Sequence, residues 1–218
     1  MLSSVSPKSA DPAVRSALIE SAARLLAEEG PQHLTLRRLA GEVGTSTMAV
    51  YTHFGGMDAL RREVRREGFA RLAAHVAAVE RTRDPVAHVV LLGCAYYRSA
   101  TANPHLYRVM FMEQPLDEAD AVDGHDTFGA LVEGVARCVA AGRLDAAAPE
   151  ELATQLWGSG HGLVALELAG LLAPPRALDT WISTAQNLFR ANGDDARAAA
   201  RSVAAARRRA GRPGLVGR

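Results

Sequence analysis

The sequence is poor in the features that mark secreted, metal-dependent and membrane proteins. Its only cysteines, Cys94 and Cys138, lie in apolar helical patterns without ligand-like neighbours. We therefore expect reduced core residues of a cytoplasmic protein, and no metal or other cofactor. The start, MLSSVSPKSADPA, lacks the apolar segment of a signal peptide. The longest apolar stretch, around 163–173, contains Glu167 and is too short to cross a bilayer, which predicts no membrane contact.

A strong excess of charge of one sign is also absent, because the formal net charge is only +1. The charges are unevenly distributed, however. Residues 1–72 carry ten basic and eight acidic side chains, 73–193 carry eight basic and fourteen acidic ones, and 194–218 carry seven arginines against two aspartates. The acidic middle segment is not expected to face nucleic acid, whereas either end is suited to it.

The alternation of polar and apolar residues that marks β-strands is missing, and helix signals dominate. Asp11-Pro12, Asp84-Pro85 and Asn103-Pro104 each combine a helix-capping side chain with a proline suited to the first turn. The pattern predicts an all-α protein of about nine helices, followed by an Ala/Arg-rich tail that is helical to about residue 209. The predicted helices cover 12–29, 35–43, 46–52, 57–80, 85–100, 104–112, 126–141, 149–172 and 179–191, with an acidic loop over 113–124.

The segment 34–60 predicts two short helices separated by a tight turn and followed by a third helix. Thr35 is suited to cap the first helix and Gly44 to end it, and Thr45 or Ser46 to cap the second. The second helix has an apolar side and a thin edge of small and polar side chains. A short helix of this kind, braced by the helix before it, is what enters a major groove of DNA.

The same segment carries a family resemblance. From Asp11 to about Leu72 the chain resembles the N-terminal domain of the TetR family of bacterial transcriptional repressors, through Leu34-Thr35, Leu39-Ala40, Gly44, Tyr51-x-His53-Phe54 and Ala59-Leu60. The resemblance implies a TetR-like fold, with a helix-turn-helix domain over 1–55 and the start of a connecting helix over 56–80. A ligand-binding and dimerisation domain would follow over 81–193, and a tail over 194–218. It also implies a homodimer that binds double-stranded DNA at a palindromic operator and responds to a small-molecule effector.

The resemblance assigns roles to individual residues of the helix-turn-helix domain. Base contacts are implied for the leading edge of the second short helix, and a bidentate contact to guanine for an arginine of the preceding helix. Phosphate contacts are implied for Tyr51 and His53, and for the helix end that Thr35 caps. The predicted DNA-binding residues are Thr35, Arg37, Ser46, Thr47, Met48, Ala49, Tyr51 and His53. Met57 stands where the family often has a lysine, so that phosphate contact is lost or moved to Arg61 and Arg62.

The predicted ligand-binding and dimerisation domain carries weaker sequence signals. The segment from Trp157 through His161-Gly162 resembles a C-terminal subclass of the family. Two interpretations of His161 remain open: it hydrogen-bonds inside a ligand pocket, or it is an ordinary core histidine. The predicted pocket consists of Tyr96, Tyr97, Tyr107, Met110, Phe111, Phe128, Trp157 and His161, and plain core packing is the alternative for each. The predicted dimer interface consists of Leu156, Gly160, Val164, Leu168, Trp181, Ala185, Leu188 and Phe189.

Two other classes of protein compete with a regulator. An enzyme is not expected: Ser159 is preceded at the second position by Trp157 and not by the glycine of a nucleophile elbow, and no strand leads into it. Phosphate-loop and metal-ligand spacings are missing too, so no catalytic residue is predicted. A helical interaction module without specific DNA binding remains the alternative.

Overall fold

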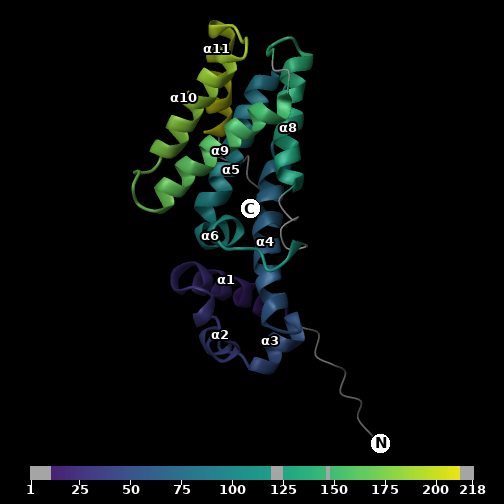
Figure 1. Cartoon of the computed structure of the whole chain (residues 1–218), viewed down its shortest axis with the longest axis vertical. Coiled ribbons are helices and arrows are strands. Elements are labelled where there is room, and N and C mark those ends of the chain that lie inside the picture. Colours follow the sequence, from purple (N-terminus) through teal and green to yellow (C-terminus); the bar gives the residue numbers. More distant parts are fainter. Residues whose placement is uncertain (1–10, 119–124, 146–147, 212–218) are drawn as a thin grey trace, which may run out of the picture. The chain divides into compact units, whose positions relative to one another are not determined.

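The computed structural model of the protein describes residues 11–118, 125–145 and 148–211. Within these ranges it contains ten α-helices, one 3-10 helix and no β-strand (Figure 1), which confirms the all-α prediction and comes close to the predicted number of helices. The α-helices are α1 (Pro12–Glu29), α2 (Leu36–Val43), α3 (Thr47–Phe54), α4 (Met57–Ala77), α5 (Pro85–Ala102), α6 (Pro104–Phe111), α8 (His125–Ala140), α9 (Pro149–Leu168), α10 (Arg176–Ala191) and α11 (Ala196–Ala210), and the 3-10 helix is η1 (Pro31–His33). Part of the predicted acidic loop lies outside the described residues.

The chain divides into two compact units. Unit 1 comprises Met1–Gly68 and His105–Ala121, and unit 2 comprises Phe69–Pro104 and Val122–Arg218. This division differs from the predicted domains, because most of α6 belongs with the N-terminal helices. Leu106 and Val109 of α6 are buried in the apolar core of unit 1, which explains the difference. None of the helices in the described part of the chain is long and apolar enough to cross a bilayer.

Capping side chains set the beginnings of the first three helices of unit 1. Asp11 caps α1, Thr35 caps α2 and Ser46 caps α3, each by accepting a hydrogen bond from a backbone amide of the first turn. Leu18, Leu25 and neighbouring residues of α1 then pack against the inner faces of α2, α3 and α4 in one apolar core. The short helices are therefore held by burial of one face, because helices of eight residues are not stable alone.

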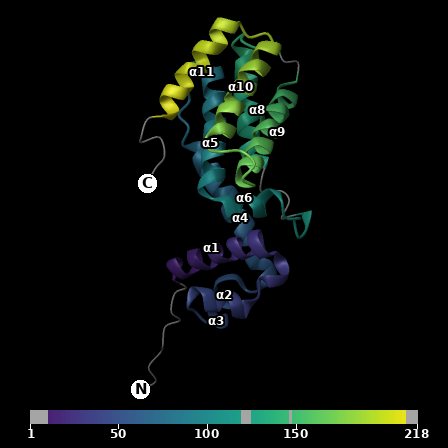
Figure 2. The same cartoon turned by 90° about the vertical axis from the view of Figure 1, so that its left-hand side faces the viewer.

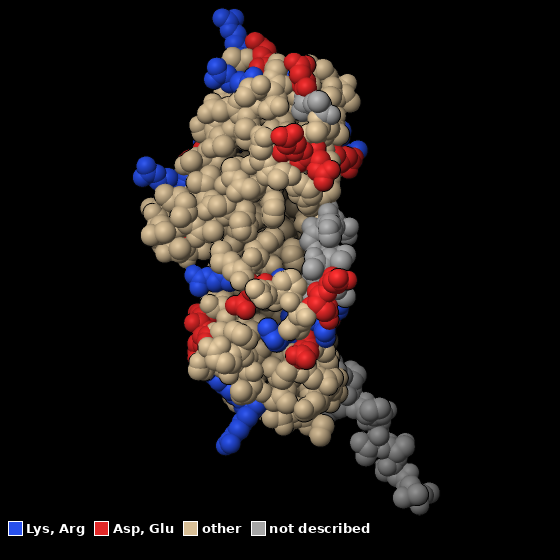
Figure 3. Space-filling view, viewed as in Figure 1, with Lys and Arg blue, Asp and Glu red and all other residues tan. Residues whose placement is uncertain are grey.

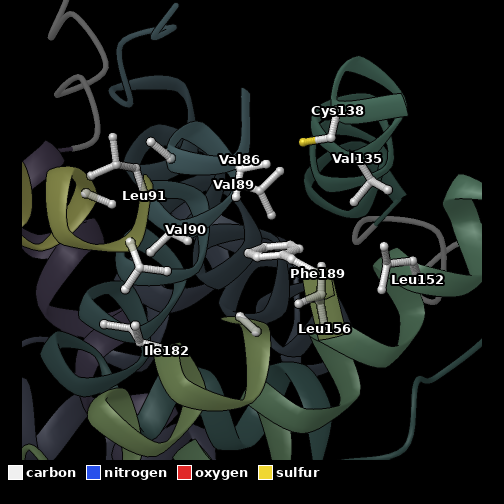
Figure 4. Packing of buried hydrophobic residues seen from close by; sticks show 14 of the residues in the cluster. Val86, Val89, Val90, Leu91, Val135, Cys138, Leu152, Leu156, Ile182 and Phe189 are labelled. Atoms are coloured by element: carbon white, nitrogen blue, oxygen red, sulfur yellow. The ribbon is translucent and has the colours of Figure 1, made fainter. Parts of the chain in front are cut away.

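Unit 2 is a bundle in which α5, α8, α9, α10 and α11 pack against one another (Figures 1 and 2). The centre of the bundle is formed by apolar side chains from all five helices, and Phe189 of α10 lies fully buried among valines and leucines from α5, α8 and α9 (Figure 4). Every helix of the bundle thus contributes to a single core.

Trp181 of α10 is inserted between α5 and α9. Its indole Nε1 donates a hydrogen bond of 3.0 Å to the backbone carbonyl oxygen of Leu156. The ring fits only because two positions lack a side chain: a Cβ added at Gly93 would lie 1.8 Å from the ring, and one added at Gly160 would lie 2.9 Å from its nitrogen. The two glycines are therefore required by close packing.

The Ala/Arg-rich end is part of the bundle rather than a solvated tail. α11 packs against α5 and α10, and its Ala199, Val203 and Ala206 are buried. At the start of the helix, the buried carboxylate of Asp194 receives Arg143 Nε at 2.7 Å and Nη2 at 2.8 Å. Alanines give a weak apolar signal in a sequence, but they allow two helices to approach closely.

The packing of Trp181 predicts the effect of one substitution. Gly93→Ala should lower the free energy of unfolding by about 1–3 kcal/mol, because the added methyl group overlaps the indole ring. Chemical denaturation followed by circular dichroism measures this change. Gly129→Ala in α8 is the matched control, since a Cβ there meets nothing within 4 Å and should raise stability by about 0.5–1 kcal/mol. Equal effects of the two substitutions would contradict the packing argument.

Candidate nucleic-acid interface

α2, the turn after it and α3 form a helix-turn-helix. Gly44 ends α2 in the left-handed conformation with φ 72°, and the amide of Thr45 donates to the carbonyl oxygen of Ala40 at 2.9 Å. Ser46 then caps α3 by accepting the amide of Ala49 at 3.1 Å. Three residues therefore turn the chain from one helix into the next, and each satisfies a backbone or capping requirement.

α3 has one buried face and one exposed face. Val50 and Phe54 lie in the core of unit 1, whereas Ser46 and Thr47 are exposed and the Met48 side chain is 70% exposed. The exposed end of α3 therefore carries a hydroxyl-and-methyl edge of the kind that contacts bases in a major groove.

The remaining predicted contacts of the head lie around this edge. Tyr51 is 49% exposed, so its hydroxyl is accessible, while Ala49 and the imidazole of His53 are half-buried. Thr35 is exposed, and its hydroxyl oxygen accepts the amide of Arg38 at 3.3 Å, which leaves the hydroxyl hydrogen free to donate. Phosphate contacts by Tyr51, His53 and Thr35 stay predictions.

Arg37 and Arg38 are adjacent in the chain but have different environments. Arg38 donates to both carboxylate oxygens of Glu29, at 2.7 and 2.6 Å, and its Nε reaches Glu42 at 3.3 Å. These hydrogen bonds to Glu29 raise the pKa of Arg38 and lower that of the Glu29 carboxyl. Arg38 is thus held between α1 and α2, and Glu42 is held in turn by Ser21 at 2.6 Å and by Arg24. Arg37 is exposed and makes no ion pair within the described ranges, so it is the arginine available to DNA.

Arginines of α4 make structural contacts that the sequence did not reveal. Arg65 is 5% exposed and donates to the carbonyl oxygens of Met110 and Glu113, at 2.6 and 2.8 Å. It therefore satisfies carbonyl groups at the end of α6. Arg62 pairs with Asp117 at 2.6 Å, and Arg66 pairs with Glu63. The partners of Arg62 and Arg65 are distant in sequence, so no local pattern indicates these contacts.

The predicted pocket residues fall into both units. Tyr107 and Met110 are buried in unit 1, where Phe111 is half-buried with its ring centroid 5.1 Å from that of Tyr107. The other five predicted pocket residues, Tyr96, Tyr97, Phe128, Trp157 and His161, belong to unit 2.

Four of these residues are in contact with one another in unit 2. Tyr96 Oη lies 3.1 Å from His161 Nδ1, and the ring of Trp157 lies 5.6 Å from His161 and 5.9 Å from Phe128. Burial lowers the pKa of His161, which favours the neutral form of the imidazole.

The predicted dimer residues lie mostly inside the protomer. Leu156, Gly160, Val164, Trp181, Ala185 and Phe189 are buried, and Leu168 and Leu188 are half-buried. The apolar pattern of α9 and α10 thus describes their packing on each other, and the six buried residues are not available to a second chain. The outer face of α9 carries other residues: Trp157, Gly158, Gly162 and Leu166 are exposed, and Leu171 follows the helix. The surface over α9 is almost free of charged side chains (Figure 3).

A capped three-residue turn between two short helices, with an exposed edge on the second helix, is the arrangement of a helix-turn-helix motif. Comparison with known proteins identifies the family. Residues 18–64 match the model of bacterial regulatory proteins of the tetR family, and residues 89–185 match a tetracyclin repressor-like C-terminal domain. The chain belongs to the TetR family and is a DNA-binding transcriptional regulator.

Individual relatives agree with this assignment. The chain is 29% identical over 158 residues to an uncharacterized HTH-type transcriptional regulator of Mycobacterium tuberculosis, which covers 72% of each chain. It is 40% identical over 77 residues to the HTH-type transcriptional repressor AcnR of Corynebacterium diphtheriae, covering 34% of this chain and 40% of AcnR. The crystal structure of the TetR family regulator PfmR from Thermus thermophilus has the same fold, with a TM-score of 0.65, 20% identity, and coverage of 79% of this chain and 97% of PfmR.

The different environments of Arg37 and Arg38 predict that replacing each one has a different effect on stability. Arg38→Ala should lower the melting temperature measurably, because it leaves Glu29 unpaired and weakens the link between α1 and α2. Arg37→Ala should leave the melting temperature unchanged, since its side chain is exposed and pairs with no other described residue. Differential scanning calorimetry of the two variants compares them directly. A destabilised Arg37→Ala protein would show that Arg37 also has a structural role.

Proposed function

We propose that the protein is a ligand-responsive repressor that binds a palindromic operator as a homodimer in the cytoplasm. The observation that carries the proposal is the exposed edge of α3, with Arg37 unengaged on the neighbouring helix. Thr47 is suited to hydrogen-bond a base, Met48 and Ala49 to contact a thymine methyl group, and Arg37 to reach a guanine. The similarity to AcnR, which is a repressor, supports repression over activation.

A homodimer is needed because one such edge spans too few base pairs to select a site. Two edges in one assembly would read two half-sites one helical turn apart. The outer face of α9 is suited to the pairing, since Trp157 and Leu166 offer apolar surface and added Cβ atoms at Gly158 and Gly162 would meet nothing within 4 Å. Backbones of two copies can therefore approach closely there.

Repression would follow from occupancy of a promoter by this dimer. An effector bound to the helical body, among residues such as Tyr96, Phe128, Trp157 and His161, would favour a conformation whose two heads no longer match the operator spacing. Because the ligand only shifts a population, its effect is bounded by the difference between its affinities for the two conformations. The alternative function is a helical interaction module without specific DNA binding.

Selection of binding sites from random duplex DNA tests the proposal. We expect an inverted repeat, and a gel shift in which scrambled DNA of the same length competes poorly. Arg37→Ala should relax the preference at one base pair of each half-site, by about 1–3 kcal/mol. Tyr51→Phe should weaken binding to all sequences alike, since a phosphate contact carries no base information. Binding that depends only on the total charge of the DNA would favour the interaction-module alternative.

The proposed pairing surface predicts the behaviour of a second variant. Leu166→Glu should convert the dimer into a folded monomer, because it places a charge in an apolar contact while the side chain is 42% exposed in the single chain. Ala200→Glu, at an exposed position of α11, is the matched control and should remain dimeric. Sedimentation equilibrium distinguishes the two states. A dimer that withstands Leu166→Glu would place the interface elsewhere.

A further inference from the structure

Glu167 stands out as a buried carboxylate in an otherwise uncharged stretch. It lies in the last turn of α9 and is the only charged residue between Glu151 and Arg176. Although its neighbour Leu166 is exposed, Glu167 is only 8% exposed. A lone carboxylate in such a position costs free energy unless its oxygens are hydrogen-bonded or paired with a cation.

Only one of the two carboxylate oxygens has a partner. Tyr97 of α5 donates its hydroxyl to Oε1 at 2.7 Å. Oε2 is buried and makes no hydrogen bond to any described residue, and no lysine, arginine or histidine in those ranges forms an ion pair with Glu167. The carboxylate therefore retains an unused acceptor and an uncompensated charge.

The surroundings of Tyr97 keep its phenol protonated. Burial, followed by the hydrogen bond to Glu167 and the charges of Glu167 and Asp179, raises the pKa of Tyr97 to about 12. The phenol thus stays protonated and continues to donate to Oε1. Asp179 is itself paired with Arg207 at 2.8 Å, so that arginine is already engaged. No residue of the described part of the protomer therefore supplies a hydrogen-bond donor to Oε2.

We propose that Glu167 and Tyr97 form the polar end of a binding site for a small organic cation, in which a protonated nitrogen of the ligand donates to Glu167 Oε2. A second copy of the chain is a poorer source of a cationic donor. Residues 152–175 contain no lysine or arginine, so pairing along α9 would not bring one to Glu167. The inference rests on the proposed function only in treating this ligand as the effector.

A ligand-free measurement tests the uncompensated charge. Glu167→Gln keeps an oxygen to accept from Tyr97 and removes the charge, so the melting temperature should rise by about 2–4 °C. Tyr97→Phe deprives the carboxylate of its one partner and should lower it. Glu151→Gln, at an exposed position of the same helix, should change it little. A melting temperature that falls in Glu167→Gln would mean that the carboxylate already has a stabilising partner and would overturn the proposal.

Three probes of the same shape test the class of ligand. Thermal shifts are measured with 2-phenylethylamine, 2-phenylethanol and phenylacetate at equal millimolar concentrations. We expect only the amine to stabilise the wild-type protein and the Glu151→Gln variant, and its affinity to fall at least tenfold in Glu167→Gln. The proposal would be overturned if the amine shifted the melting temperature no more than the alcohol does. It would also be overturned if the amine shifted the melting temperature equally in the wild-type protein and in Glu167→Gln.

Sedimentation and DNA binding separate a ligand site from a contact between two copies and from the operator-binding function. If Glu167→Gln changes the dimer dissociation constant and not the response to the amine, then the donor belongs to a second copy and the cation site is refuted. The amine titration contains no DNA. A failure to bind the selected operator would therefore count against the proposed function alone, and a failure to bind the amine would count against the cation site alone.

Discussion

The insertion of the Trp181 indole between α5 and α9 is the constraint on which unit 2 depends. The ring occupies the space that Gly93 and Gly160 leave empty, and its N–H is satisfied by the carbonyl group of Leu156. Close packing and a buried donor together allow one spacing of the helices, because a shift would cost either contact or the hydrogen bond. That spacing turns one face of α9 inward. The contact of Glu167 with Tyr97 and the exposure of Leu166 both follow from it.

Those parts of the structure that depend on neighbouring residues could be predicted from the sequence. The caps Asp11, Thr35 and Ser46 and the stop at Gly44 act within one helical turn, so the short helices were placed to within about two residues of their observed ends. The exposed edge of α3 was predicted for the same reason. Val50 and Phe54 are four residues apart and mark the buried side of α3. The opposite side of the helix must then be the exposed one.

The rest depends on residues far apart in the chain. No local pattern distinguishes Arg37 from Arg38, because the partner that holds Arg38 is Glu29 in the preceding helix. The apolar face of α9 and α10 was interpreted as a contact between two chains, since a sequence does not tell whether a face is covered from within or from outside. α11 was placed outside the folded body because alanines carry little hydrophobic signal, although they fill the narrow space against α5.

The condition of the two thiols makes the protein convenient for spectroscopy. Cys94 and Cys138 are buried, and burial raises their pKa values to about 11 and about 12. Maleimides and related reagents attack the thiolate, so neither residue should be labelled in the folded protein at neutral pH. A cysteine introduced at an exposed position such as Ser16 would then carry the sole spin label of each chain. In the proposed dimer, the distance between the two helix-turn-helix domains then becomes measurable by electron paramagnetic resonance without first removing the native cysteines.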